Sequence, residues 1–272
     1  MQASIPAEGI VLGTAARMAT VLTLLWMLVG EPWWGRVSHR RLIARLSAGD
    51  TDARARLYRS WTAGLWATAL VVLLLAVLAP GFGLERLGLA WPHAFDLPGI
   101  RPSVAAGFVA GALVAFAAGA LAAHKMADRQ AYRPHVVGGE GVLAMLPRTR
   151  AERRSFAILA VTAGITEEIV WRGFLLAAFV ALFPPLPFVV YVLVGAAWFG
   201  FAHLYQGVSG IVATAVVGAI LILLYLATGS ILLPIVVHAL LDLRALLIRV
   251  DGDAGGVAAQ AVAATGENGP AE

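Results

Sequence analysis

The sequence contains no cysteine. This absence excludes disulfides, thiolate metal sites and a cysteine nucleophile. Charged residues are also scarce, at 13% of the chain, against about 25% in soluble domains. Hydrophobic residues make up 60%, so the composition indicates a membrane protein. The net charge of +4 would suggest a nucleic-acid partner in a soluble protein. Here the arginines gather in two loops, and topology and anionic lipid explain them better.

Seven stretches are apolar and close to the length of about 20 residues that crosses a bilayer as a helix. They are 10–30, 61–78, 103–123, 156–183, 186–203, 210–228 and 231–248. The sequence therefore predicts an all-α, polytopic transmembrane helix bundle of about seven spans. We expect N-terminal scaffold helices with basic loops in 1–150, a second membrane domain in 151–250, and a disordered tail in 251–272.

Positive charge is distributed unevenly over the connections between these spans. Seven basic residues lie in the first connection, seven in the third and two in the second. They are, in that order, Arg36, Arg40, Arg41, Arg45, Arg54, Arg56 and Arg59; Lys125, Arg129, Arg133, Arg148, Arg150, Arg153 and Arg154; Arg86 and Arg101. Because basic loops stay in the cytoplasm, we expect the N-terminus outside and the C-terminus inside. The short loops and the lack of organelle signals favour a bacterial plasma (inner) membrane.

The segment 40–58 has apolar residues at helical spacing with arginines between them. This pattern predicts an amphipathic helix on the inner leaflet. A solvated basic loop is the alternative.

Only six acidic, basic or imidazole side chains interrupt the apolar region 155–243. They are Glu167, Glu168, Arg172, His203, His238 and Asp242. A charged group inside a bilayer costs about 2.5–3.5 kcal/mol on insertion scales, so six of them need a reason. Carboxylates and imidazoles are the side chains that transfer protons or bind metals.

The spacing of these residues divides them into groups. Glu168 and Arg172 are four residues apart, share a helix face and neutralise each other. Glu167 points about 100° away and is free to face another helix. His238 and Asp242 also share a face, so the carboxylate fixes the imidazole tautomer or both bind one metal. Each motif alone has a structural alternative: a buried ion pair, an interfacial histidine or a His–Asp hydrogen bond.

Together the motifs are more specific than any one of them. Glu-Glu-x-x-x-Arg, Phe-x-x-x-His and His-x-x-x-Asp follow in this order, each within a predicted span. This pattern resembles the CPBP family, the CAAX-protease and bacteriocin-processing (Abi) intramembrane proteases. The likeness covers 156–249. It implies an endopeptidase that hydrolyses a peptide bond of a membrane-associated peptide or protein, with its active site among the last four spans.

The resemblance also implies roles for the individual residues. Glu167 would activate the attacking water, aided by His203. Glu168 would pair with Arg172 and keep the shape of the site. His238, together with the residue four positions later, would bind a metal or stabilise the oxyanion.

The family is described both as metalloproteases and as glutamate-dependent proteases. A divalent metal such as zinc and metal-free catalysis therefore both remain open. The ligands of such a metal would be Glu167, His203, His238 and Asp242. Some members carry Asn at the position of Asp242. Because an ionised Asp cannot donate a hydrogen bond to an oxyanion, Asp242 favours a metal ligand or an orienter of His238.

Three other functions fit parts of the sequence. Gly207-Val208-Ser209-Gly210 matches the Gly-x-Ser-Gly of rhomboid-type serine proteases, but the match is short, and Ser209 capping the next helix explains it better. Intramembrane Glu, His and Asp also act as proton relays, which fits a proton-coupled transporter. A non-catalytic immunity or scaffold protein would keep these residues for folding. In each case the expected partners are membrane lipid or a peptide or protein, and no nucleic acid.

Overall fold

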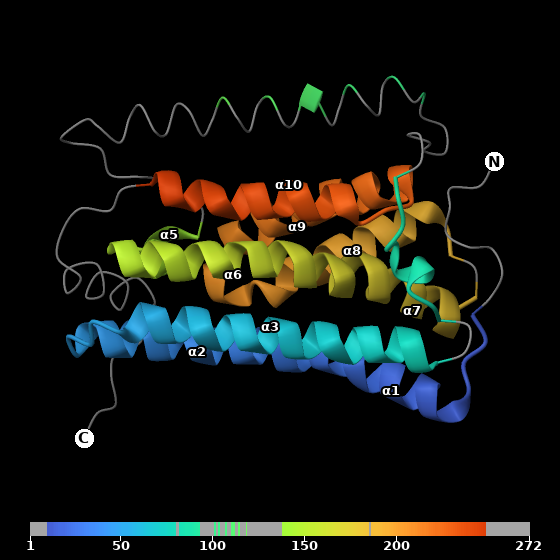
Figure 1. Cartoon of the computed structure of the whole chain (residues 1–272), viewed down its shortest axis with the longest axis horizontal. Coiled ribbons are helices and arrows are strands. Elements are labelled where there is room, and N and C mark those ends of the chain that lie inside the picture. Colours follow the sequence, from blue (N-terminus) through green and yellow to red (C-terminus); the bar gives the residue numbers. More distant parts are fainter. Residues whose placement is uncertain are drawn as a thin grey trace.

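The structure is a computed structural model that describes residues 10–79, 82–92, 138–184 and 186–248, with isolated helical positions between 101 and 118. Within these residues it is helical and has no strands, so the all-α prediction is confirmed. The α-helices are α1 (Thr14–Leu25), α2 (Glu31–Ser47), α3 (Ala53–Leu78), α5 (Gly139–Met145), α6 (Arg150–Glu168), α7 (Leu175–Leu182), α8 (Phe188–Ala202), α9 (Gly207–Thr228) and α10 (Leu232–Leu243). Most of them run along one common axis (Figure 1). The predicted tail 251–272 and most of the predicted span 103–123 lie outside the described residues.

The first helix is longer than the predicted span. α1, a π-helical turn at Trp26–Gly30 and α2 follow one another without a break. At 1.5 Å per residue the run 14–47 is about 50 Å long, whereas the hydrocarbon core of a bilayer is about 30 Å thick. Its arginine-rich second half therefore extends beyond the apolar first half.

The single helix predicted over 40–58 is wrong. α2 ends at Ser47 and α3 begins at Ala53, with a turn between them. Gly49 has a φ of 78°, a left-handed conformation that glycine adopts without strain. The Asp50 carboxylate accepts a hydrogen bond from the Asp52 backbone N–H at 3.0 Å. The turn reverses the chain, so α2 and α3 form a helical hairpin (Figure 1). The helical spacing of apolar residues continues across the turn although the helix does not.

Three helix pairs organise the C-terminal half. α6 packs along both α3 and α10, and α8 packs along α9. A Cβ added to Gly164 of α6 would lie 2.8 Å from the backbone nitrogen of Ala239 in α10. A Cβ added to Gly200 of α8 would lie 2.6 Å from the Ile211 carbonyl oxygen in α9. Small residues at these crossings let the helix backbones approach closely, as in other membrane helix pairs.

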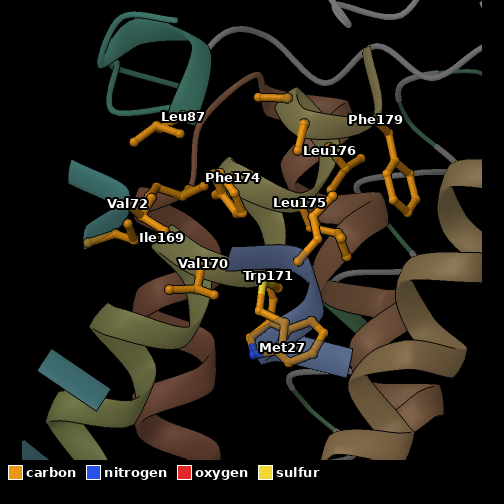
Figure 2. Packing of buried hydrophobic residues seen from close by; sticks show 14 of the residues in the cluster. Met27, Val72, Leu87, Ile169, Val170, Trp171, Phe174, Leu175, Leu176 and Phe179 are labelled. Carbon is orange, nitrogen blue, oxygen red and sulfur yellow. The ribbon is translucent and has the colours of Figure 1, made fainter. Parts of the chain in front are cut away.

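The main core surrounds a second π-helical turn, Ile169–Phe174, which joins α6 to α7. Every residue of this turn is buried. Figure 2 shows its side chains packed with Met27 and Val72 of the N-terminal hairpin and with Leu87. Phe174 stacks on Phe82 with ring centroids 5.9 Å apart. The turn that follows the paired glutamates is thus held from several sides.

The predicted count of seven spans is not confirmed. Among the described residues, two helical segments are long and apolar enough to cross a membrane, Ala53–Leu78 and Leu204–Thr228. The apolar helix α8 has only 15 residues, and α6 carries charged residues at its end. Two such helices are consistent with a membrane protein but support it only weakly on their own.

The segment 138–152 packs against the arginine-rich end of the helical hairpin formed by α2 and α3 and leads into α6. The Tyr58 hydroxyl donates to the Met145 carbonyl at 2.5 Å, and His39 Nε2 donates to the Gly141 carbonyl at 3.0 Å. Arg54 Nη1 lies 3.6 Å from Glu152 Oε1. The Arg54–Glu152 contact crosses the predicted boundary at 150, and the division into domains there stays a prediction.

Candidate active site

Glu168 lies at the centre of a buried group of side chains. Its Oε1 accepts hydrogen bonds from Arg172 Nη1 at 2.8 Å and from His238 Nδ1 at 2.6 Å. The side chains of Glu168 and Arg172 are fully buried, and that of His238 is 7% exposed. Glu168 therefore joins the end of α6 to the middle of α10 and fixes the orientation of the His238 ring. The sequence favours Asp242 as a metal ligand or as an orienter of His238; in the structure Glu168, on another helix, makes the hydrogen bond to this ring.

Local structure explains how Glu168 reaches α10. Gly164 lies one turn before Glu168, and Ala239 follows His238. The close approach of Gly164 to Ala239 brings the two helices together at this level. The Glu168–Arg172 pair spans the junction between α6 and the π-helical turn. Such turns are frequent at functional sites.

Several polar atoms of this group have no hydrogen-bond partner. They are Arg172 Nε and Nη2, Glu168 Oε2 and Glu167 Oε2. The Arg172 guanidinium instead lies 4.2 Å from the centroid of the Phe199 ring, a favourable cation–π contact. Buried charges with incomplete pairing are costly, which indicates that the arrangement is kept for a reason other than stability.

His203 approaches the same region from the end of α8. Its Nδ1 lies 2.9 Å from the Phe199 carbonyl oxygen. A carbonyl only accepts, so Nδ1 carries a proton, and Nε2 of the neutral ring is an acceptor. The Phe199 ring lies between the two imidazoles, with centroid distances of 4.8 Å to His203 and 6.1 Å to His238.

A cavity of about 300 Å³, which we call the site cavity, brings together four of the six predicted residues. It is lined by Glu167, His203, His238 and Asp242. His238 Nε2 lies 3.9 Å from Glu167 Oε2 and 3.7 Å from Asp242 Oδ2. Neither distance is a direct hydrogen bond, and each leaves the facing atoms free for a third group such as water. Glu168 and Arg172 do not line the cavity and lie behind it.

The sequence motifs missed other groups near the site. Thr214 donates to Gln206 at 3.4 Å, and Gln206 donates to the Tyr205 hydroxyl at 3.1 Å, which forms a polar chain along the wall of the site cavity. Tyr205 and Gln206 come directly after the Phe-x-x-x-His motif, and that proximity was the available signal. Glu31 has a buried carboxylate oxygen without a hydrogen-bond partner and interacts electrostatically with Glu167. No motif in the sequence around Glu31 indicates that it lies near Glu167.

The predicted metal ligands do not form a metal site as they are placed. Glu168 engages Nδ1 of His238 and a carbonyl engages Nδ1 of His203, as is usual for metal-binding histidines, so Nε2 of each ring stays available. Across the described ranges, no group of three or more His, Asp or Glu residues could hold a metal ion. No catalytic step is therefore assigned to a metal, and the metal requirement stays a prediction.

Ser209 lies apart from the site. It is exposed and does not line the site cavity. The capping position of α9 is Gln206, so the predicted capping role of Ser209 is also wrong. The rhomboid-type alternative has no geometric support.

Comparison with known protein families gives a match over part of the chain, residues 151–244. This segment matches a family of membrane-embedded endopeptidases of the CAAX type. The family is described as "Type II CAAX prenyl endopeptidase Rce1-like", and the match confirms the resemblance to CPBP intramembrane proteases. Comparisons with curated proteins and with solved structures each gave no match.

Proposed function

We propose that the protein is an intramembrane endopeptidase that hydrolyses a peptide bond with water activated by Glu167. One observation carries this proposal: Glu167, His203, His238 and Asp242 line a single cavity although they come from three helices far apart in sequence. The family match over 151–244 supports a CAAX-type endopeptidase in general.

In the proposed reaction, a water molecule in the site cavity attacks the scissile carbonyl while Glu167 accepts its proton. Glu167 Oε2 has no hydrogen-bond partner and is available to bind that water. Two proton carriers then serve the leaving amine. Glu167 returns the proton, or His203 Nε2 delivers it after taking it up from the cavity.

His238 would stabilise the tetrahedral intermediate. Its Nδ1 donates to Glu168, so an imidazolium would present Nε2–H to the developing oxyanion. Glu168, Glu167 and Asp242 supply nearby negative charge for that imidazolium. Arg172 fixes the position of Glu168, and Asp242 limits how far the ring rotates.

The substrate is proposed to be a peptide or protein anchored in or at the membrane. Leu65, Val217 and Leu241 give the site cavity apolar walls beside its polar group. An apolar cavity with a few polar groups suits an extended chain that arrives from lipid. We also propose a bacterial plasma membrane, with the C-terminus and the basic end of the bundle in the cytoplasm.

Cleavage of a CAAX-type peptide by purified Glu167→Ala protein tests the proposal. We expect a loss of about 10²–10⁴-fold relative to the wild type, the usual contribution of a general base. The matched control is Glu152→Ala, which removes another buried carboxylate outside the site cavity. Undiminished cleavage by folded Glu167→Ala would reject the mechanism.

A second measurement separates the rival functions. Wild-type protein in liposomes should cleave peptide and should not move protons. Proton flux without cleavage would favour a transporter. A Glu167→Gln protein that fails to fold, rather than failing to cleave, would favour a scaffold. Metal analysis of the same preparation, with cleavage assayed in the presence of chelator, decides the metal requirement: loss of cleavage would assign a metal, and undiminished cleavage would assign metal-free catalysis.

A further inference from the structure

A second cavity lies between α2 and α3, away from the site cavity. It has a volume of about 510 Å³ and is lined by four arginines, Arg41, Arg45, Arg56 and Arg59. We call it the arginine pocket. No step of the proposed proteolysis uses it.

The helical hairpin builds this pocket from one face of each helix. On α2, Trp34, Ser38, Arg41 and Arg45 line it at spacings of four, three and four residues, which places them on one face. Residues of α3 close the other side. The floor is apolar, because Leu42 and Leu57 belong to a small core cluster that includes Met145. The four arginines thus surround a packed apolar floor.

The four arginines of the pocket have few acidic residues near them. Asp50 pairs with Arg56 and interacts electrostatically with Arg45. In the described part of the chain, Arg41 and Arg59 make no hydrogen bond or ion pair. Both are exposed. Guanidinium groups bind phosphate in a bidentate manner, which makes this an anion site.

The position of the pocket along the hairpin indicates the source of the anion. Leu22, Leu25, Val29 and Trp33 form an exposed apolar stripe along the first helix. The stripe ends at Trp33, and Arg41 lies about 12 Å further along the helix at 1.5 Å per residue. Aromatic residues mark the membrane–water interface. The pocket therefore lies where lipid headgroups would meet the protein.

We propose that the arginine pocket binds the phosphate of an anionic phospholipid headgroup. Juxtamembrane basic clusters attract anionic lipids, and this pocket adds a defined shape to that attraction. The acyl chains would lie along the exposed stripe that ends at Trp33. Trp34 forms part of the pocket wall and lies 6.2 Å, between ring centroids, from Trp61, which lines the site cavity. The two cavities are neighbours separated by this tryptophan pair.

Native mass spectrometry of the full chain in detergent tests the proposal without any measurement of proteolysis. The probes are phosphatidylglycerol, phosphatidylcholine and inorganic phosphate, each titrated separately. We expect phosphatidylglycerol to bind at least tenfold more tightly than phosphatidylcholine. The double variant Arg41→Gln/Arg59→Gln should lose at least tenfold in affinity for phosphatidylglycerol.

The matched control is Arg36→Gln/Arg150→Gln, which removes the same charge from exposed positions outside the pocket. It should change the affinity less than threefold. A further variant, Ser60→Trp, fills the pocket and leaves all four arginines in place; it should also release the lipid. Thermal melting checks that every variant is folded.

Three results would overturn the proposal. Equal binding of phosphatidylcholine would show that the pocket does not recognise the net negative charge of the headgroup. Equal losses in the pocket variant and the charge control, or unchanged binding in Ser60→Trp, would indicate diffuse attraction to the basic surface. Displacement of the lipid by inorganic phosphate at equal concentration would assign the pocket to a free anion. None of these results bears on the role of Glu167.

Discussion

Among the residues that the structure describes, two arginine–glutamate pairs are buried, and their surroundings differ. Glu152 Oε2 accepts from the backbone N–H groups of Arg148 and Thr149 at 2.8 and 3.0 Å, and Arg54 Nε donates to the Ala144 carbonyl at 2.8 Å. That pair is bonded to the backbone and holds a loop against a helix start. Glu168 instead accepts from two side chains, Arg172 and His238.

The difference teaches how to distinguish a structural charge from a functional one. The Arg54–Glu152 pair completes the capping of α6 through Thr149 and Glu152, and its removal would free backbone groups. The hydrogen bonds of the Arg172–Glu168 pair described above join side chains. Glu168 bonds to the His238 ring, which lines the site cavity. The predictions below test whether this distinction holds.

Replacing the arginine of each pair should have the largest effect. Arg54→Met and Arg172→Met each leave a buried carboxylate without its cation, which costs about 3–5 kcal/mol in unfolding free energy. Chemical denaturation in detergent measures this loss, with exposed Arg150→Met as the control. Peptide cleavage per folded molecule should fall only for Arg172→Met. A similar fall for Arg54→Met would break the comparison.

Neutralising the glutamates should separate the pairs by activity. Glu168→Gln keeps an acceptor for His238 but removes the charge, and we expect cleavage to fall by up to about 10⁴-fold, as for the carboxylate that orients the histidine of a Ser-His-Asp triad. Glu152→Gln keeps the capping geometry, since Gln also serves in a capping box, and should cleave at the wild-type rate. The ratio of kcat values in folded protein is the measurement.

The close crossing of α6 and α10 gives a smaller effect. Gly164→Ala places a methyl group within 3 Å of Ala239, and overpacking of this kind costs about 1–3 kcal/mol. Cleavage should also fall, because the helices must separate where Glu168 meets His238. Gly13→Ala, where an added Cβ meets nothing within 4 Å, is the control. Normal kcat in Gly164→Ala would show that the crossing does not set the site geometry.

The smallest expected effect concerns pH. Burial lowers the pKa of His39, and its hydrogen bond to Gly141 opposes this only in part. Because the unfolded pKa is about 6.5, the neutral ring stabilises the fold fully above that pH, and the contribution is lost as pH falls below it. Between pH 7.5 and 5.5 the Tm of the wild type should fall more than that of His39→Gln. The difference should be no more than about 2–4 °C, which about 1 kcal/mol produces in a chain of this size. An identical pH dependence in both proteins would contradict the assignment.

Local spacing predicted much of the site because four residues are one turn of helix. The Glu168–Arg172 pair follows from that rule alone, and the three motifs together indicated the family. The contact between Glu168 and His238 could not be predicted in this way. It depends on the rotation of two helices and on their close approach at Gly164, which is a property of the packed fold.

The errors in the fold have similar causes. The helical spacing of apolar residues in 40–58 gave no sign of the turn at Gly49. The apolar length of the first span ended the predicted helix at Gly30, although the helix continues. The span count also depended on apolar length, which does not distinguish a helix surrounded by protein from one facing lipid. The residues next to Glu31 in the sequence do not indicate that its carboxylate is buried near the site.

The π-helical turn Ile169–Phe174 changes which residue positions share a helix face before and after it. A π turn accommodates one more residue than an α turn, so everything after it is rotated by about 100° relative to a uniform helix. Residues 175–182 are therefore out of phase with 150–168. Deleting one residue inside the turn would therefore restore a uniform α-helix and leave α7 facing its present neighbours. The turn absorbs one residue of the fourth hydrophobic segment without changing the direction in which α7 faces.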